Sequence, residues 1–246
     1  MTVETIPLHQ LLLSFIPVVF LTLLMWRWKL DYKNLVYAMS RMLIQLLTVG
    51  YVLIYVFETE SSAVVIAILT LMILVSSWIA LNAIKQHSIS LYAKAFISIG
   101  LGGGLTLVLI SQFVLQIDPW FSPQFMIPLA GMVFANAMTS LSLAADRLTS
   151  ELNNGATYEH ARGIAFQTAL IPIINSLFAV GLVSLPGMMT GQILSGVSPF
   201  IAARYQILVM CMIFSSNGIS AACFLILLKR DPYFKQKIIE TNPQTR

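Results

Sequence analysis

The sequence has few charged residues: 10% of its 246 positions are Asp, Glu, Lys or Arg, whereas 58% are hydrophobic. A soluble globular domain has about a quarter of its residues charged, so this composition excludes a soluble domain. The mean hydropathy of +0.84 instead indicates a membrane protein. Seven spans of roughly 20 apolar residues would use about 140 positions, which leaves no room for a large soluble domain.

The sequence also lacks the motifs of catalysis and of ATP binding. No segment matches G-x-x-x-x-G-K-[ST], so the chain has no P-loop. No Asp or Glu falls within an apolar run. The spans provide no Ser-His-Asp set, carboxylate pair or Cys-His nucleophile, so we expect the chain not to be an enzyme. Cys211 and Cys223 are 12 residues apart in one apolar run, about 18 Å along a helix, which is too far for a disulfide.

The apolar runs predict an all-α, polytopic membrane protein with about seven transmembrane helices. The expected spans are 7–26, 36–57, 63–84, 95–115, 125–145, 168–186 and 203–228. No basic residue precedes the first span, so we expect it to be retained rather than cleaved as a signal peptide. No internal repeat or linker interrupts the pattern, so residues 1–246 are expected to form a single transmembrane domain.

Basic residues determine the expected orientation. Lys and Arg gather after spans 1, 3, 5 and 7, whereas the opposite segments contain mainly acidic residues. Basic loops stay on the cytoplasmic side of a membrane. The sequence therefore predicts that the N-terminus is outside and the C-terminus inside the cell.

The segment between spans 5 and 6, residues 146–166, is expected to be a cytoplasmic loop. Gly155 predicts a helix end that needs a left-handed backbone, and Thr157 can cap the next helix. We expect two short helices that meet here, with Leu148 and Leu152 one turn apart on an apolar surface that contacts a partner. The alternative is an ordinary amphipathic loop.

Several segments carry a resemblance to a known family. They are RMLIQL at 41–46, GYVL at 50–53, AKAFIS at 93–98, IPLAGM at 127–132, NAM at 136–138, GLVSLPGMMTG at 181–191 and RYQI at 204–207. Together they resemble the FetB-type permease family, the membrane half of bacterial ABC transporters assigned to iron export, to which plant aluminium-sensitivity permeases are similar.

The family resemblance implies a function and partners. The chain would be a permease subunit in the bacterial cytoplasmic (inner) membrane that works as a homodimer and exports iron or another metal ion. A separate cytoplasmic ATP-binding subunit would bind ATP and Mg, so no cofactor is expected in this chain. Nucleic acid is not an expected partner.

The loop between spans 5 and 6 has a second resemblance. Gly155-Ala156-Thr157, followed by Ile171-Pro172, is similar to the loop by which ABC permeases insert a coupling helix into their ATP-binding subunit. This resemblance assigns the coupling role to Leu152, Gly155, Ala156 and Thr157. The 17 positions from Gly155 to Pro172 suggest about one extra helical turn relative to common importers.

Polar residues inside the spans are candidates for the substrate pathway. Arg41 and Gln45 are one helical turn apart on span 2, and Asn136, Asn175 and Asn217 lie on spans 5, 6 and 7. An ionisable or amide side chain at membrane depth faces protein or water. The alternative is that Arg41 extends to the interface and that each amide makes only a hydrogen bond to a neighbouring helix.

Pro186 and Gly187 predict a break in the helix at the end of span 6. Residues 188–198 could then form a short re-entrant or interfacial helix. The candidate gate or subunit-interface residues are Pro186, Gly187, Met188, Met189 and Gly191. The alternative is a kink that serves packing alone.

Small residues with four-residue spacing predict close helix contacts. Gly100 and Gly104 form one such pair on span 4. On span 5 the row is Gly131, Ala135 and Thr139.

The metal site is unknown from the sequence. An iron(II) site would use carboxylate and imidazole groups, but His9, His87 and His160 are far apart in the sequence. Softer donors are more numerous: Met126, Met132, Met138, Met188, Met189, Met210, Met212 and Cys211. Such donors suit copper(I) better than iron, although filling of the core is the usual role of Met.

Other functions remain open. The solute could be a non-metal compound such as a nucleotide sugar or a small anion. An ion-coupled secondary transporter would need carboxylates inside the membrane, which the spans lack. A membrane scaffold would explain the cytoplasmic loop but not the polar residues within the spans.

Overall fold

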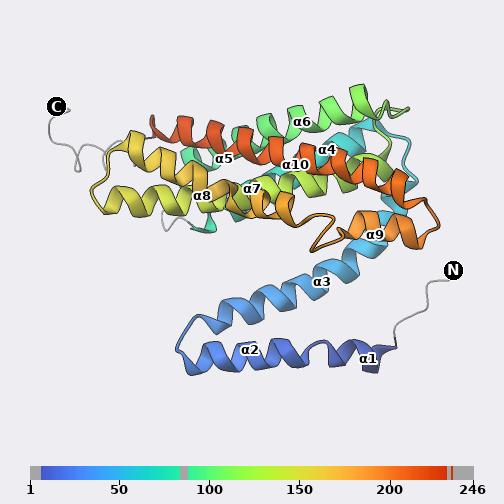
Figure 1. Cartoon of the computed structure of the whole chain (residues 1–246), viewed down its shortest axis with the longest axis horizontal. Helices are drawn as coiled ribbons and strands as arrows, with labels where there is room; N and C mark the ends of the chain where they lie inside the picture. The colour runs from blue at the N-terminus through green and yellow to red at the C-terminus, as the bar shows by residue number, and fades with distance from the viewer. Residues whose placement is uncertain (1–6, 84–87, 232–233, 235–246) are drawn as a thin grey trace. The chain divides into compact units, whose positions relative to one another are not determined.

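The computed structural model describes residues 7–83, 88–231 and 234 (Figure 1). The chain divides into two compact units, Met1–Thr59 and Glu60–Arg246. Seven helical segments of the described residues are long and apolar enough to cross a membrane. The prediction of an all-α protein with seven spans is therefore confirmed, and the only β interaction among the described residues is an isolated bridge between Val180 and Ser184. The inside and outside positions of the termini remain a prediction.

The first unit contains three helices, α1 (Leu8–Leu13), α2 (Ile16–Arg27) and α3 (Tyr32–Phe57). α2 packs against α3. Lys29 adopts a positive φ of 58° in the turn that joins them, and the Asp31 side chain accepts a hydrogen bond from the Asn34 backbone N–H at 3.2 Å, which caps α3.

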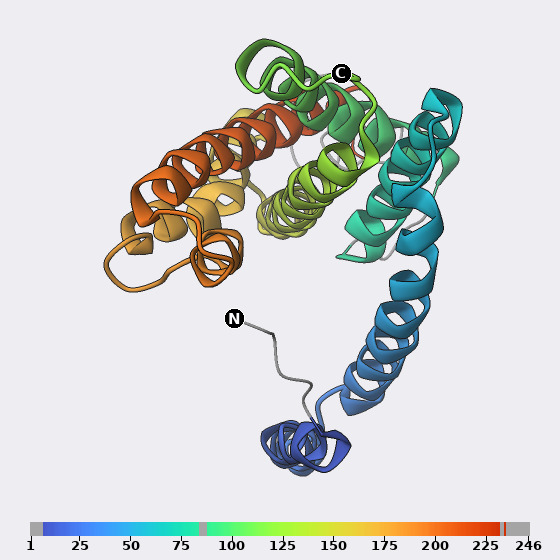
Figure 2. The same cartoon turned by 90° about the vertical axis from the view of Figure 1, so that its right-hand side faces the viewer.

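The second unit is a bundle of longer helices. Its elements are α4 (Ser62–Ala80), η1 (Leu81–Ala83), α5 (Ile89–Ile99), η2 (Gly100–Gly104), α6 (Leu105–Val108), η3 (Leu109–Val114), α7 (Pro123–Asn153), α8 (Tyr158–Ala179), α9 (Gly187–Leu194) and α10 (Pro199–Leu228). α5 to η3 form one continuous span, in which η2 and η3 are π-helical. α7 packs against α4, α8 and α10, and Figure 2 shows it at the centre of this unit.

The buried face of α7 follows the period of an α-helix. Its side chains at intervals of three or four residues are inaccessible, as expected for a helix with one packed stripe. They include Met126, Ala130, Val133, Ala137, Leu141, Ala144, Leu148 and Leu152. The many alanines on this stripe let neighbouring helices approach closely, which favours packing in a membrane, where apolar burial drives little association.

The glycine that lies closest to the backbone of another helix is Gly102, which is not one of the pair predicted from the sequence. A Cβ atom added at Gly102 would lie 2.6 Å from the backbone N of Ser220, whereas a Cβ atom added at Gly100 or Gly104 would have no described residue within 4 Å. The prediction for Gly100 and Gly104 is therefore wrong. The reason is the π-helical turn η2, because its larger number of residues per turn moves the glycines away from the face that a regular α-helix would give them.

The small-residue row on α7 does not form a close contact within this unit. Ala135 and Thr139 are exposed, and a Cβ atom at Gly131 would meet only the methyl group of Met72, at 3.6 Å. The prediction that this row packs tightly is therefore not borne out among the described residues.

Two helix boundaries also differ from the prediction. α8 begins at Tyr158 rather than near residue 168, and it ends at Ala179 rather than at Pro186. The early end follows from Gly181, whose φ of +84° lies outside the helical range. The backbone N–H groups of Val183 and Ser184 then donate to the Ala179 carbonyl at 2.8 and 3.1 Å, which closes the turn.

Candidate functional site

A tight turn joins α7 to α8 at one end of the second unit. Gly155 adopts a φ of +87°, and its N–H donates to the Leu152 carbonyl at 3.2 Å. The N–H of Ala156 donates to the Glu151 carbonyl at 3.1 Å, and Thr157 is the residue before α8. These bonds satisfy the last carbonyls of α7 in the manner of a glycine-terminated helix. The predicted helix end at Gly155 is confirmed. Thr157 occupies the N-cap position of α8 as predicted, but its side chain makes no capping hydrogen bond there.

The predicted apolar surface of this segment needs a correction. Leu148 and Leu152 are 0% and 2% exposed, so they pack inside the bundle and do not face a partner. The segment 146–166 is also not a pair of separate short helices, because it consists of the ends of α7 and α8. No residue that stops a helix lies between Asp146 and Leu152, so α7 continues to Asn153. The exposed part of the turn is residues 153–155 and Thr157.

Two contacts tie the start of α8 to the end of α10. The Tyr158 hydroxyl donates a hydrogen bond to the Leu225 carbonyl, and the Tyr158 side chain is 2% exposed. The Lys229 Nζ lies 2.7 Å from the Glu159 Oε1. The residues that follow the α7–α8 turn are thus bonded to the end of α10.

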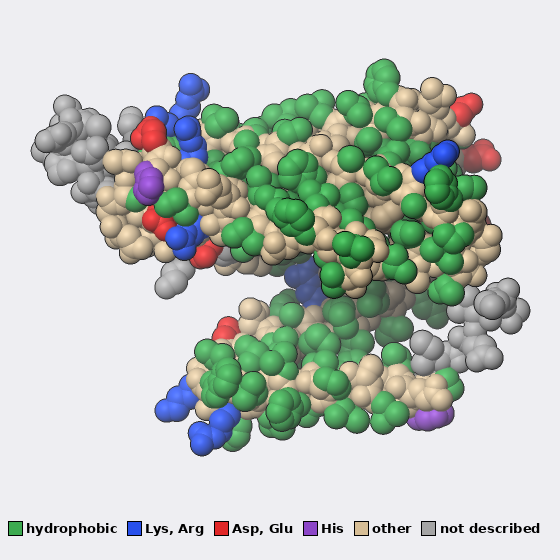
Figure 3. Space-filling view, in the orientation of Figure 1, with side chains coloured by type: hydrophobic (Ala, Val, Ile, Leu, Met, Phe, Trp, Pro, Cys, Tyr) green, Lys and Arg blue, Asp and Glu red, His purple; other side chains and the backbone are tan. Residues whose placement is uncertain are grey.

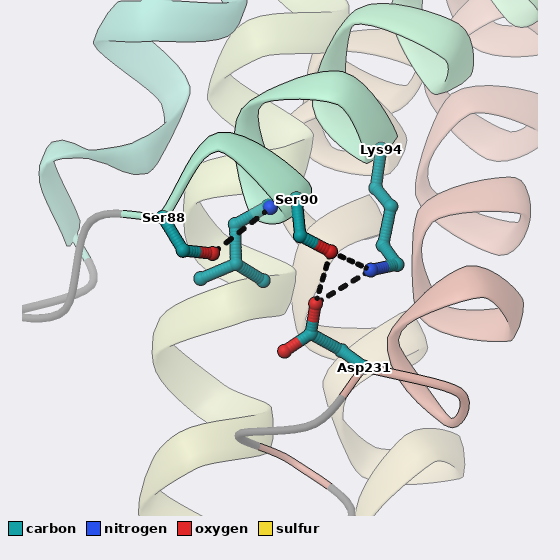
Figure 4. A network of polar contacts seen from close by, with 5 residues as sticks. Ser88, Ser90, Lys94 and Asp231 are labelled. Atoms are coloured by element: carbon teal, nitrogen blue, oxygen red, sulfur yellow. Dashed lines mark hydrogen bonds and ion pairs between the residues drawn. The ribbon is translucent and has the colours of Figure 1, made fainter.

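A polar network ties α5 to the segment after α10 (Figure 4). The Lys94 Nζ lies 2.5 Å from both the Asp231 Oδ2 and the Ser90 Oγ, and the Ser90 hydroxyl donates to the same carboxylate oxygen at 2.9 Å. The Lys94 and Asp231 side chains are 16% and 2% exposed. This buried ion pair was not expected from the sequence, because its partners are 137 residues apart and no local pattern links them.

Charged side chains gather around the α7–α8 turn. Figure 3 shows them at the end of the second unit, whereas the long sides are mainly apolar. Arg147 and Glu151 form an ion pair at 2.6 Å one helical turn apart, and Lys229 and Glu159 form another at 2.7 Å. This end therefore has the chemistry of a surface in water, which agrees with its predicted location at the cytoplasmic face.

The break around Pro186 produces a separate short helix, as predicted. Pro186 is the residue before α9, and α9 packs against the first part of α10. Pro199 is the first residue of α10, so the two prolines delimit the segment. The role of Gly187, Met188, Met189 and Gly191 as a gate or subunit interface remains a prediction.

A cavity of about 620 Å³ lies between α7, α9 and α10. Met132 and Met188 line it together with Gln192, Tyr205 and other, mainly apolar residues. The Oε1 atom of Gln192 is buried and has no hydrogen-bond partner among the described residues. A mainly apolar cavity with a few polar groups is typical of sites that bind organic molecules.

The predicted pathway residues differ in their surroundings. Asn136 is half-buried and donates from Nδ2 to the Met132 carbonyl of its own helix at 2.8 Å. Asn175 is exposed on α8. Asn217 is 3% exposed on α10, and its Oδ1 has no partner among the described residues. Arg41 and Gln45 lie on α3 in the first unit, where they are half-buried and exposed, respectively.

The described residues hold no group of three or more His, Cys, Asp or Glu side chains that could bind a metal ion. His160 follows the α7–α8 turn and His9 lies in α1 of the first unit. His87 lies outside the described residues. A site made of carboxylate and imidazole ligands, which iron(II) favours, is thus absent from the described part of the chain.

Comparison with known proteins identifies relatives over nearly the whole chain. The model of the uncharacterised protein family UPF0014 matches residues 8–233. The UPF0014 membrane protein slr1647 of Synechocystis sp. is 36% identical over 231 residues, which are 88% of this chain and 89% of that protein. The probable iron export permease protein FetB of Escherichia coli is 35% identical over 214 residues, 80% of this chain and 81% of FetB.

A plant protein is also similar. The protein ALUMINUM SENSITIVE 3 of Arabidopsis thaliana is 32% identical over 203 residues, which are 76% of this chain and 73% of that protein. The resemblance noted from the sequence is therefore confirmed. No solved structure matches this chain.

Proposed function

Since this chain belongs to the UPF0014 family of membrane proteins, we propose that it is the permease subunit of an ABC transporter that exports iron or another metal ion. The relative named as an iron export permease supports the assignment of cargo and direction. The chain has no P-loop, so a separate cytoplasmic subunit binds ATP and Mg. The permease acts as a homodimer in the bacterial inner membrane.

The observation that carries this proposal is the α7–α8 turn. Its exposed residues 153–155 and Thr157 stand at the charged end of two long helices. α7 has 31 residues, which corresponds to about 46 Å, so it reaches from this turn through a bilayer core of roughly 30 Å. A short exposed turn joined to two membrane-spanning helices is the geometry needed for a partner to move the bundle.

The mechanism follows from the contacts behind the turn. When ATP closes the partner subunit, the partner pushes or pulls residues 153–157. The bond from Tyr158 to Leu225 and the pair of Glu159 with Lys229 transmit this displacement to α10. α10 packs against α9, so the movement reaches the cavity that Met188 lines. Rocking of packed helices between two arrangements then opens a path alternately to each side of the membrane.

A non-metal solute is the second candidate cargo. The cavity of about 620 Å³ is mainly apolar and much larger than a bare metal ion. An organic solute would fit such a cavity better than a hard cation. A small anion is the third candidate, because it also needs no carboxylate ligands.

The test is co-purification of this chain with its candidate ATPase, followed by measurement of ATP hydrolysis in proteoliposomes. We expect a stable complex whose hydrolysis is stimulated by iron(II) or by another metal ion. Nucleotide sugars and small anions are assayed in parallel, and stimulation by one of them alone would assign the second or third cargo. A stable complex without stimulation by any solute would favour a scaffold, and the absence of a complex would overturn the proposal.

A further inference from the structure

A second cavity, of about 320 Å³, lies between the end of α8, α9 and α10. Met189 of α9 and Met210 and Cys211 of α10 line it, together with Gln206 one helical turn before Met210. Met189 and Met210 are 21 positions apart in the sequence. The turn around Gly181 and the short helix α9 bring Met189 next to α10. Three sulfur-containing side chains from two helices thus share one cavity.

Gln206 supplies this cavity with a buried polar group. Its side chain is 5% exposed, and its Oε1 is buried without a hydrogen-bond partner among the described residues. A buried polar atom without a partner lowers the stability of the folded protein. Gln206 is one of the residues that line the cavity, and the unused lone pair of its amide oxygen suits it to a cation or to a donor group bound there.

The geometry points to a binding site for a soft monovalent metal ion, copper(I) or silver(I), in this cavity. Thioether and thiol groups are the ligands that such ions prefer, and an amide oxygen can complete the set. The cavity has neither a carboxylate nor an imidazole in its lining, which disfavours iron(II) and other harder ions. Its volume leaves room for the ion with a small ligand of its own.

Binding requires no change of oxidation state. The Cys211 thiol loses its proton to water as the sulfur–metal bond forms, and the ion stays monovalent. The Cys211 side chain lies at the edge of the helix bundle, whereas Met210 and Gln206 are buried within it. The identification of this ion as transported cargo rests on the proposed function, but the site itself does not.

Control variants for the proposed metal site come from the 620 Å³ cavity and from the second cysteine of α10. Met188 precedes Met189 but lines the 620 Å³ cavity. Cys223 is half-buried on the same helix as Cys211 and does not line the 320 Å³ cavity. Met188→Leu and Cys223→Ser therefore change the same chemical groups outside the proposed site.

The experiment measures silver(I) binding to the purified full-length chain by competition with a chromogenic chelator. We expect one ion per chain, with sulfur ligands in the X-ray absorption spectrum. Met210→Leu combined with Cys211→Ser should weaken binding by more than the roughly 10–100-fold that loss of an outer-shell partner costs. Met188→Leu and Cys223→Ser should leave affinity unchanged. Equal affinity in the double variant and the wild type would overturn the site.

The variant Gln206→Leu tests whether Gln206 is a ligand of the metal ion or a residue that only stabilises the fold. This change should weaken silver(I) binding and leave the thermal stability of the metal-free protein unchanged or higher, because it removes an unpaired buried polar group. Lower stability with unchanged affinity would contradict the role of Gln206. If silver(I) binds but does not stimulate ATP hydrolysis by the complex, the site is retained and its role in transport is rejected. If the complex does not form, only the proposed function is rejected.

Discussion

The Lys94 Nζ lies 2.5 Å from the Asp231 Oδ2, and this ion pair joins α5 to the segment that follows α10. The carboxylate also accepts a hydrogen bond from Ser90. Both charges are largely withdrawn from solvent, and loss of either leaves the other buried without its counter-charge. The pair therefore holds together two helices that begin and end at the same side of the bundle.

Lys94→Met is expected to destabilise the protein by about 3 kcal/mol, because it removes the cation that lies against the buried Asp231 carboxylate. Adding Asp231→Asn should recover part of this loss, since the charge is then removed as well. Lys229→Met is the control, because it breaks the exposed pair with Glu159 and should cost less than about 1 kcal/mol. Unfolding in mixed micelles measures the three free energies. Equal losses for Lys94→Met and Lys229→Met would contradict the importance of burial.

Gly102→Ala is expected to destabilise the bundle by about 1–3 kcal/mol, because the added methyl group would meet the backbone of Ser220. Gly100→Ala and Gly104→Ala have open space at the same position and should stabilise the helix by up to about 1 kcal/mol. The sign of the change in stability thus distinguishes Gly102 from Gly100 and Gly104 on the same span. Thermal unfolding of the purified variants measures it, and a stabilised Gly102→Ala would show that η2 and α10 pack differently.

Gly155→Pro is expected to abolish ATP hydrolysis linked to transport, while the protein still inserts into the membrane. Proline cannot adopt the φ of +87° and removes the N–H that donates to Leu152. Gly155→Asn is the control and should retain most of the coupling, because Asn tolerates a left-handed backbone. Hydrolysis by the reconstituted complex is the readout. Full coupling in Gly155→Pro would reject the role of this turn.

Tyr158→Phe is expected to lower stability by about 1 kcal/mol, because the Leu225 carbonyl loses the hydroxyl donor in a buried position. Tyr51→Phe removes a hydroxyl from an exposed tyrosine on α3 and should change little. Unfolding in mixed micelles compares the two variants. An equally small effect of both would indicate that the bond from α8 to α10 adds nothing to stability.

Asn154→Cys tests the orientation of the chain, in a background with Cys211→Ser and Cys223→Ser. A thiol reagent that does not cross membranes should label it in inside-out vesicles and not in intact cells, because basic loops remain in the cytoplasm. Glu60→Cys, in an exposed position before α4, should show the reverse pattern. Labelling of Asn154→Cys from outside would invert the predicted topology.

The sequence indicated several local features correctly. The number of spans followed from the length of the apolar runs, because a membrane imposes that length on each helix. The helix end at Gly155 followed from the need for a positive φ, and the short helix after Pro186 followed from the loss of a backbone donor. Each of these features depends on neighbouring residues alone.

Other features could not be read from local patterns. The helix that begins after Thr157 was predicted as a separate short helix, but it continues without a break into the next span as α8. Leu152 appeared suited to a partner surface, but the neighbouring helices bury it. The π-helical turn changed which glycine meets α10.

The sequence by itself determined that this protein is helical and lies in a membrane, because composition and helical period act over short stretches of chain. Only the tertiary structure decided that Lys94 meets Asp231 and that Met189 shares a cavity with Met210 and Cys211. These contacts join residues from different helices. Their partners are selected by how whole helices pack, which depends on shape along their full length and leaves no local signal in the sequence.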